Sequence, residues 1–95
     1  MNIDSLGVTP PSVMRELVAA GSVSDVSIQA AEQGLVIIVR LGSTERVLGV
    51  ARGGIRHFKS LDGAASFLQD LGIFQFEVDT NNWIPKTKMV IEAST

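Results

Sequence analysis

Apolar side chains recur at helical spacing in the first quarter of the chain and predict a short amphipathic helix. The helix is predicted over about residues 10–20, with Thr9 as a hydroxyl N-cap and Pro10 at the first helical position, where a missing N–H is harmless. Gly21 follows as the residue that ends it. The side chains of its buried face are Val13, Met14, Leu17 and Val18.

Three strands with short connections are predicted next. Residues 25–30 form the first, and residues 35–41 form a β-branched run that is apolar on both faces, as is typical of a central strand. Gly42 and Ser43 indicate a turn before the third strand, residues 45–51. Two consecutive glycines then interrupt the pattern, and residues 55–58 resume the strand or begin another.

A second helix and a last strand complete the pattern. The helix is predicted over residues 61–71, with Ser60 or Asp62 as its cap and Gly72 at its end. Residues 73–79 alternate between apolar and polar side chains and predict a half-buried strand. Its core-facing side chains are Phe74, Phe76 and Val78.

The order α-β-β-β-α-β predicts an α+β fold in two layers. We expect an antiparallel sheet of four to five strands with two helices on one face. A chain of 95 residues suits one domain, predicted over residues 9–79. Residues 1–8 are predicted to be a flexible leader and residues 80–95 a weakly ordered C-terminal tail. No apolar run approaches the roughly 20 residues of a membrane span, and no basic region opens a signal peptide, so a cytoplasmic protein is expected.

The composition argues against an enzyme. The chain has no cysteine, which excludes disulfides, thiolate zinc sites and cysteine nucleophiles. His57 is its one histidine, and no carboxylate lies at a spacing that would orient the ring for catalysis. Glu77 and Asp79 alone give thin support for a metal site. The pair Gly53-Gly54 lacks the lysine and hydroxyl residue of a phosphate-binding loop. We therefore expect no catalytic residue, metal or cofactor.

Charge is unevenly distributed in a chain whose net charge is −2. Five of the eight basic residues lie between Arg40 and Lys59 with only Glu45 against them, so this stretch carries +4 and the remainder −6. Such a concentration of basic residues would recognise an acidic partner surface or DNA phosphates. The alternative is that these residues lie on a solvated strand face and pair with acidic residues on neighbouring strands. The candidate partner- or nucleic-acid-binding residues are Arg46, Arg52, Arg56, Lys59 and Trp83.

If the third strand continues in register, Arg46 and Arg52 share one face. Two further features bear on assembly. Trp83 is either an interface anchor or a residue that folds back and fixes the C-terminal tail to the core. Exposed strand edges or the first helix favour a homodimer.

The middle of the chain resembles the ParC proteins of some plasmid partition operons, which are unrelated to the topoisomerase subunit of that name. The resemblance covers roughly residues 21–79. It rests on Glu45-Arg46-Val47-Leu48, Ile55-Arg56-His57-Phe58, Ser60-Leu61-Asp62 through Phe67-Leu68, Gly72-Ile73 and Phe76-Glu77-Val78-Asp79. Members continue into a basic, arginine-rich C-terminal helix, whereas residues 86–95 here carry two lysines and one acid. Functions of that helix are therefore not carried over.

The resemblance implies a plasmid-encoded accessory protein without catalytic activity. Such a protein would support partition and stable maintenance by contacting partition proteins, with a weak DNA contact as a further expectation. The alternative is a phage- or plasmid-encoded inhibitor that covers a host defence, conjugation or secretion complex, an analogy from size and composition.

Overall fold

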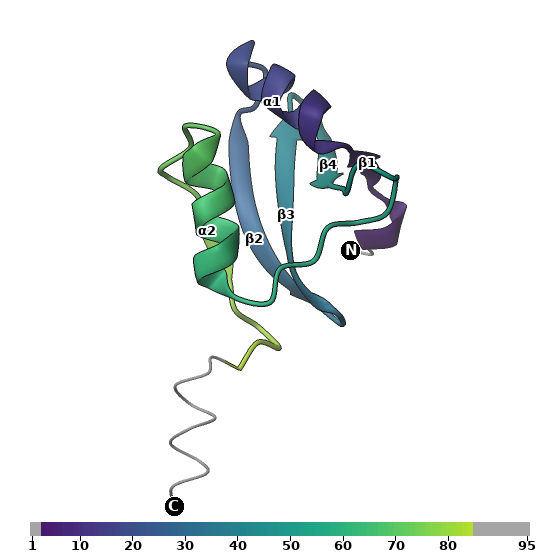
Figure 1. Cartoon of the computed structure of the whole chain (residues 1–95), viewed down its shortest axis with the longest axis vertical. Helices are drawn as coiled ribbons and strands as arrows, with labels where there is room; N and C mark the ends of the chain where they lie inside the picture. The colour runs from purple at the N-terminus through teal and green to yellow at the C-terminus, as the bar shows by residue number, and fades with distance from the viewer. Residues whose placement is uncertain (1–2, 85–95) are drawn as a thin grey trace, which may run out of the picture.

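A five-stranded mixed sheet with both helices on one face forms the architecture of the chain in the computed structural model, which describes residues 3–84 (Figure 1). Across the sheet the strands follow the order β1-β4-β3-β2-β5. In chain order the elements are a 3-10 turn η1 (Ile3–Ser5), β1 (Gly7–Thr9), α1 (Pro11–Ala19), β2 (Asp25–Ala31), β3 (Gly34–Leu41), β4 (Thr44–Leu48), α2 (Leu61–Asp70) and β5 (Glu77–Asp79).

The predicted α+β class is confirmed, and so is the central meander. β2, β3 and β4 pair antiparallel through two tight turns, as the sequence predicts. The sheet as a whole is mixed and not purely antiparallel, because β1 pairs parallel with β4 and β5 pairs parallel with β2. Each helix joins two strands that run in the same direction, and such a crossover is the connection that parallel strands require.

Residues 3–8 belong to the domain, although the sequence predicts a flexible leader over residues 1–8. Gly7–Thr9 form the edge strand β1, and Ile3 and Leu6 pack against the sheet. Thr9 is not the cap of α1, because Pro10 occupies that position and Pro11 opens the helix. The backbone of Thr9 instead belongs to β1, opposite Leu48.

The core consists of two clusters on the two faces of the sheet. The helical face holds the larger one, in which α1 contributes Met14 and α2 contributes Leu68. The smaller one, on the other face, lies beneath the N-terminal residues. The larger cluster contains Met14, Val26, Ile28, Leu35, Ile37, Val39, Leu48, Phe58, Ala64 and Leu68, and the smaller contains Val36, Ile38 and Val47. As predicted for a central strand, β3 is buried on both faces.

The predicted cap of α2 and the glycines that follow both helices are confirmed, whereas the last strand is shorter than predicted. The Ser60 hydroxyl accepts a hydrogen bond from the Gly63 N–H at 3.0 Å, and Gly72 follows α2 with φ +88°. After Gly72 the chain must return from the helical layer to the sheet, so only Glu77–Asp79 reach pairing distance of β2. Phe74, predicted to face the core, is 71% exposed. The predicted tail lies outside the described residues from 85 onward.

Candidate functional site

The segment between β4 and α2 leaves the sheet in a small loop and then rejoins it. Gly49 bridges to Ile55, and the Val50 N–H donates to the Gly54 carbonyl at 2.7 Å, which closes the loop. Phe58 then pairs with Leu35 at the start of β3 through hydrogen bonds of 2.7 and 2.8 Å. The predicted third strand thus ends at Leu48 instead of residue 51, because the chain bulges out over residues 50–54.

This loop changes the position of one predicted site residue. Arg52 is exposed within the loop, so it does not continue the strand in register with Arg46. The expectation that the two arginines share a strand face is wrong for this reason. Both residues still lie near the end of β4, because Arg46 belongs to that strand and the loop begins directly after it.

Arg46 is held by a contact with the N-terminal strand. Its side chain lies on the helical face of the sheet, because it is two residues from buried Leu48. The Arg46 Nε donates a hydrogen bond to the Thr9 hydroxyl at 3.1 Å, and Thr9 is only 1% exposed. The guanidinium also lies against Gly7, where an added Cβ would come within 2.9 Å of Cζ. β1 therefore positions Arg46 and restricts its motion.

We predict that Thr9→Val destabilises the protein by about 1 kcal/mol, because the nearly isosteric side chain removes the acceptor of a hydrogen bond from a charged donor. Urea unfolding monitored by circular dichroism measures the loss. Thr44→Val, at an exposed position of β4, is the matched control and is expected to change the free energy of unfolding by less than about 0.5 kcal/mol. Equal losses in the two variants would contradict a role for the Arg46 contact.

Arg56 is held by a contact with an aromatic ring. Its guanidinium carbon lies 4.7 Å from the centroid of the Phe58 ring, a cation–π distance. Phe58 is in turn buried in the larger core cluster, and its ring meets that of Phe67 with centroids 5.8 Å apart and planes at 56°. The core thus fixes the platform on which Arg56 rests. Arg52 and Lys59 on either side are exposed.

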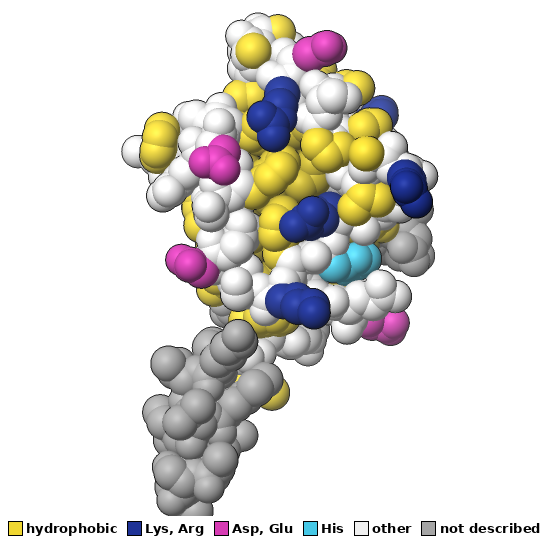
Figure 2. All heavy atoms as spheres, in the orientation of Figure 1, with side chains coloured by type: hydrophobic (Ala, Val, Ile, Leu, Met, Phe, Trp, Pro, Cys, Tyr) yellow, Lys and Arg dark blue, Asp and Glu magenta, His cyan; other side chains and the backbone are white. Residues whose placement is uncertain are grey.

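We call Arg46, Arg52, Arg56 and Lys59 the basic surface. Residues 46–61 contain these four cations and no acidic residue. Within the part of the chain that the structure describes, none of the four forms an ion pair. Figure 2 shows Lys and Arg side chains next to hydrophobic side chains that reach the surface, on the side of the molecule that carries α2 and the segment before it. This combination suits recognition of an anionic surface that also has apolar patches.

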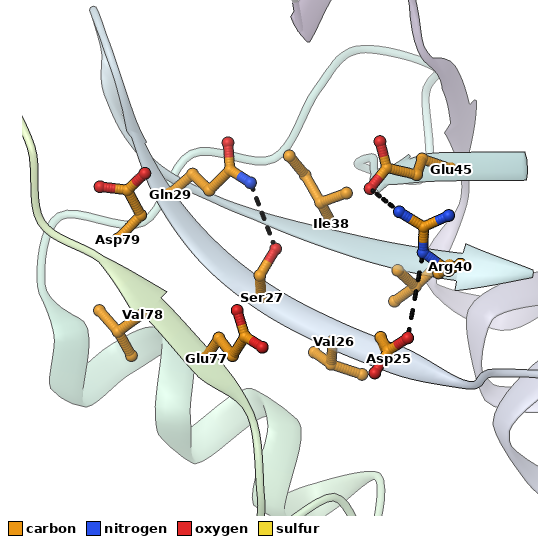
Figure 3. Close-up of a pocket in the computed structure, with 11 residues that line it drawn as sticks. Asp25, Val26, Ser27, Gln29, Ile38, Arg40, Glu45, Glu77, Val78 and Asp79 are labelled. Atoms are coloured by element: carbon orange, nitrogen blue, oxygen red, sulfur yellow. Dashed lines mark hydrogen bonds and ion pairs between the residues drawn. The ribbon is translucent and has the colours of Figure 1, made fainter. Parts of the chain in front are cut away.

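Arg40 does not belong to the basic surface, although it lies in the same stretch of sequence. It projects from the opposite face of the sheet, where it pairs with Glu45 at 3.3 Å and Asp25 at 3.9 Å (Figure 3). Because these groups are solvated, the pairs contribute little to stability. The predicted alternative of a paired strand face therefore holds for Arg40, whereas the other four basic residues have no such partners among residues 3–84.

The face that carries Arg40 has a shallow polar hollow of about 330 Å³. It spans β2, β3, β4 and β5, and in its middle the Gln29 side-chain amide donates to the Ser27 hydroxyl at 3.4 Å (Figure 3). Glu77 and Asp79 line the side formed by β5. Among the described residues, no three His, Asp or Glu side chains are arranged to hold a metal ion.

Trp83 is separated from the basic surface in the fold. It follows β5, whereas the basic surface begins with Arg46 on β4 and continues after that strand, and β3 and β2 lie between β4 and β5. Its side chain packs, partly buried, against the larger core cluster, and its backbone N–H donates to the Thr80 carbonyl at 3.0 Å. Trp83 itself thus folds back onto the core, and its predicted role at a partner interface stays a prediction. His57 is half-buried beside Gly34.

Two residues that support the site were not among the predicted ones. Phe58 could have been recognised from the spacing Arg56-x-Phe58, since alternate residues of an extended segment share a face. Thr9 carries no such signal, because its contact with Arg46 spans 37 positions of sequence. No helix in the described range is long and apolar enough to cross a membrane.

A sequence model of the family described as ParC-like matches residues 8–87. The match contains the sheet from the second residue of β1 onward and both helices, together with every residue of the basic surface. No curated protein and no solved structure matches the chain.

Proposed function

The chain belongs to the ParC-like family, and from this premise we propose that it is a non-enzymatic accessory protein of plasmid partition and stable maintenance that acts by binding a partner protein. Family membership points to a plasmid-related role. The binding role is supported by the basic surface. Its four cations lie within residues 46–61, which contain no acidic residue.

Two of the four cations are held in position before any partner arrives. Thr9 restricts Arg46, and the Phe58 ring supports Arg56. Preorganised groups lose less conformational entropy on binding, and arginine matches carboxylate and phosphate groups with two parallel hydrogen bonds. Arg52 and Lys59 are solvated and would strengthen the encounter through longer-range attraction. The surface is therefore suited to an anionic partner.

An acidic protein surface fits this arrangement better than DNA does. Apolar side chains lie between the cations in Figure 2, and a protein interface buries such groups. Domains that bind nucleic acid are usually basic overall, whereas this chain has a net charge of −2. A DNA contact through the same arginines is proposed only as a weak addition, with the steep salt dependence of phosphate binding.

The test is a tagged pull-down from the native host at near-physiological salt, with and without nuclease. We expect wild-type protein to retain a partition protein after nuclease treatment. Arg52→Ala/Arg56→Ala is expected to reduce the recovered partner about tenfold or more, because truncated arginine contacts at interfaces lose about 1–2 kcal/mol each. Arg40→Ala, which removes an arginine from the opposite face, is the matched control and should leave recovery unchanged.

Each other outcome has a definite meaning. Recovery that disappears with nuclease would show that DNA is the bridge. Recovery of a defence, conjugation or secretion complex would favour the inhibitor alternative. Equal recovery by Arg52→Ala/Arg56→Ala and wild type would contradict the basic surface as the contact. The predicted homodimer stays a prediction, for which the edge strand β1 and Val13 on α1, 41% exposed, offer contact positions.

A further inference from the structure

Within residues 3–84, the strand β5 leaves one edge of the sheet open. β5 is last in the strand order, and in the described part of the chain it pairs only with β2, through Ser27, Ile28 and Gln29. All three of its residues are exposed. An open edge presents backbone N–H and C=O groups that can pair with another extended segment.

The two sides of this edge differ in chemistry. Glu77 and Asp79 lie on the side of the polar hollow, whereas Val78 points to the helical side (Figure 3). Val78 is 42% exposed, and Phe74 just before the strand is 71% exposed. No basic side chain neutralises Glu77 or Asp79 among residues 3–84. A segment added to β5 would therefore meet carboxylates on one face and apolar side chains on the other.

We propose that the open edge of β5 binds an extended segment of a partner protein in which Lys or Arg alternates with apolar residues. In such a strand every second side chain lies on one face. Its cations would lie beside Glu77 and Asp79, at the 4.5–5.5 Å Cβ separation that is typical of directly opposite residues. Its apolar residues would cover Val78. Charge complementarity thus identifies the occupant.

A second copy of this chain is a poor occupant of the same edge. Antiparallel self-pairing centred on Val78 places Glu77 of each copy opposite Asp79 of the other. Centring the pairing on Glu77 or Asp79 instead places identical carboxylates opposite each other. Like charges directly opposite across two strands are destabilising. β5 therefore selects a basic partner strand over itself.

This inference is independent of the proposed function and extends it. The basic surface and the β5 edge lie on opposite sides of β3 and β2 in the sheet. One surface is suited to an anionic partner and the other to a basic segment, so a single chain could hold two partners at once. Failure of one contact leaves the other unaffected.

The experiment uses the full-length chain, labelled with ¹⁵N, and a synthetic eight-residue peptide of alternating Lys and Val. We expect the peptide to shift backbone amide resonances of residues 76–80 and of Ser27, Ile28 and Gln29. Glu77→Lys/Asp79→Lys is expected to weaken peptide binding about tenfold or more, because two attractive cross-strand pairs become repulsive. The same variant should gain binding of an alternating Glu and Val peptide.

Glu16→Lys/Asp70→Lys is the matched control, since it reverses two exposed carboxylates on the helices and should bind the Lys-Val peptide as wild type does. Arg52→Ala/Arg56→Ala should also bind it normally, which separates this test from that of the basic surface. Unchanged binding by Glu77→Lys/Asp79→Lys, or shifts centred elsewhere, would overturn the proposal. Concentration-dependent shifts at β5 without peptide would identify a second copy as the occupant and overturn it as well. Shifts at β5 caused by Lys86→Glu/Lys88→Glu alone would identify a later segment of the same chain as the occupant of the edge. That result would also overturn the proposal.

Discussion

Gly34→Ala is expected to destabilise the protein by about 3 kcal/mol or more, since it combines backbone strain of about 1–3 kcal/mol with a steric conflict. Gly34 has φ +146°, a value that side-chain-bearing residues rarely adopt. A Cβ there would lie 2.7 Å from the Phe58 carbonyl oxygen and 3.4 Å from the His57 Cβ. That carbonyl accepts the hydrogen bond from the Leu35 N–H, so the backbone cannot yield without breaking the pairing.

Gly42→Ala separates the two contributions. Gly42 also has a positive φ, +66°, but an added Cβ would meet no atom within 4 Å. We expect a loss of about 1–2 kcal/mol from backbone conformation alone. Urea unfolding of both variants beside wild type measures the difference. Losses of the same size at Gly34 and Gly42 would show that the close approach of residues 57–58 to β3 is unimportant.

Local signals account for the parts of the fold that the sequence predicts well. Ser60 caps α2, Gly21 and Gly72 follow the two helices with positive φ, and the apolar run of β3 is buried on both faces. Each of these features depends on side chains within a few residues of each other. The central meander follows as well, because its tight turns determine which strands are neighbours.

Contacts between distant segments account for what the sequence does not predict. β1 is three residues long and has no periodicity to detect, yet it pairs with β4 and supplies Thr9 to Arg46. The parallel pairing of the edge strands β1 and β5 likewise depends on where each helix returns the chain to the sheet. Phe74 has the alternation of a buried strand residue but lies in the return from α2, where it stays exposed.

Residues 40–59 show how much of the candidate site can be predicted from the charge pattern of the sequence. The composition of residues 40–59 correctly indicates a concentration of cations. The register of the β3–β4 hairpin then divides them: Arg40 lies opposite Glu45 on one face, and Arg46 lies opposite Val39 on the other. A bulge removes Arg52 from the strand. The candidate site is therefore a smaller set than the sequence stretch, and its supporting residues come from elsewhere in the chain.

Phe58→Ala is expected to lower the free energy of unfolding by about 3–5 kcal/mol, a large part of the roughly 5–15 kcal/mol available to a small domain. Phe58 is 5% exposed and packs in the larger core cluster against Phe67. Its removal leaves a cavity between β3 and α2, and the ring contacts are lost with it. Urea unfolding of the purified variant measures this loss.

Phe58→Leu distinguishes the structural role of Phe58 from its role in the basic surface. Leucine keeps most of the buried apolar volume, so we expect a loss of only about 1–1.5 kcal/mol and a folded protein. In this variant, however, Arg56 loses its support, because the cation–π contact requires the aromatic ring of Phe58. Partner recovery in the pull-down should therefore fall several-fold although the variant is folded. Full recovery by Phe58→Leu would show that Arg56 acts without its aromatic support, and preorganisation would then rest on the contact between Arg46 and Thr9.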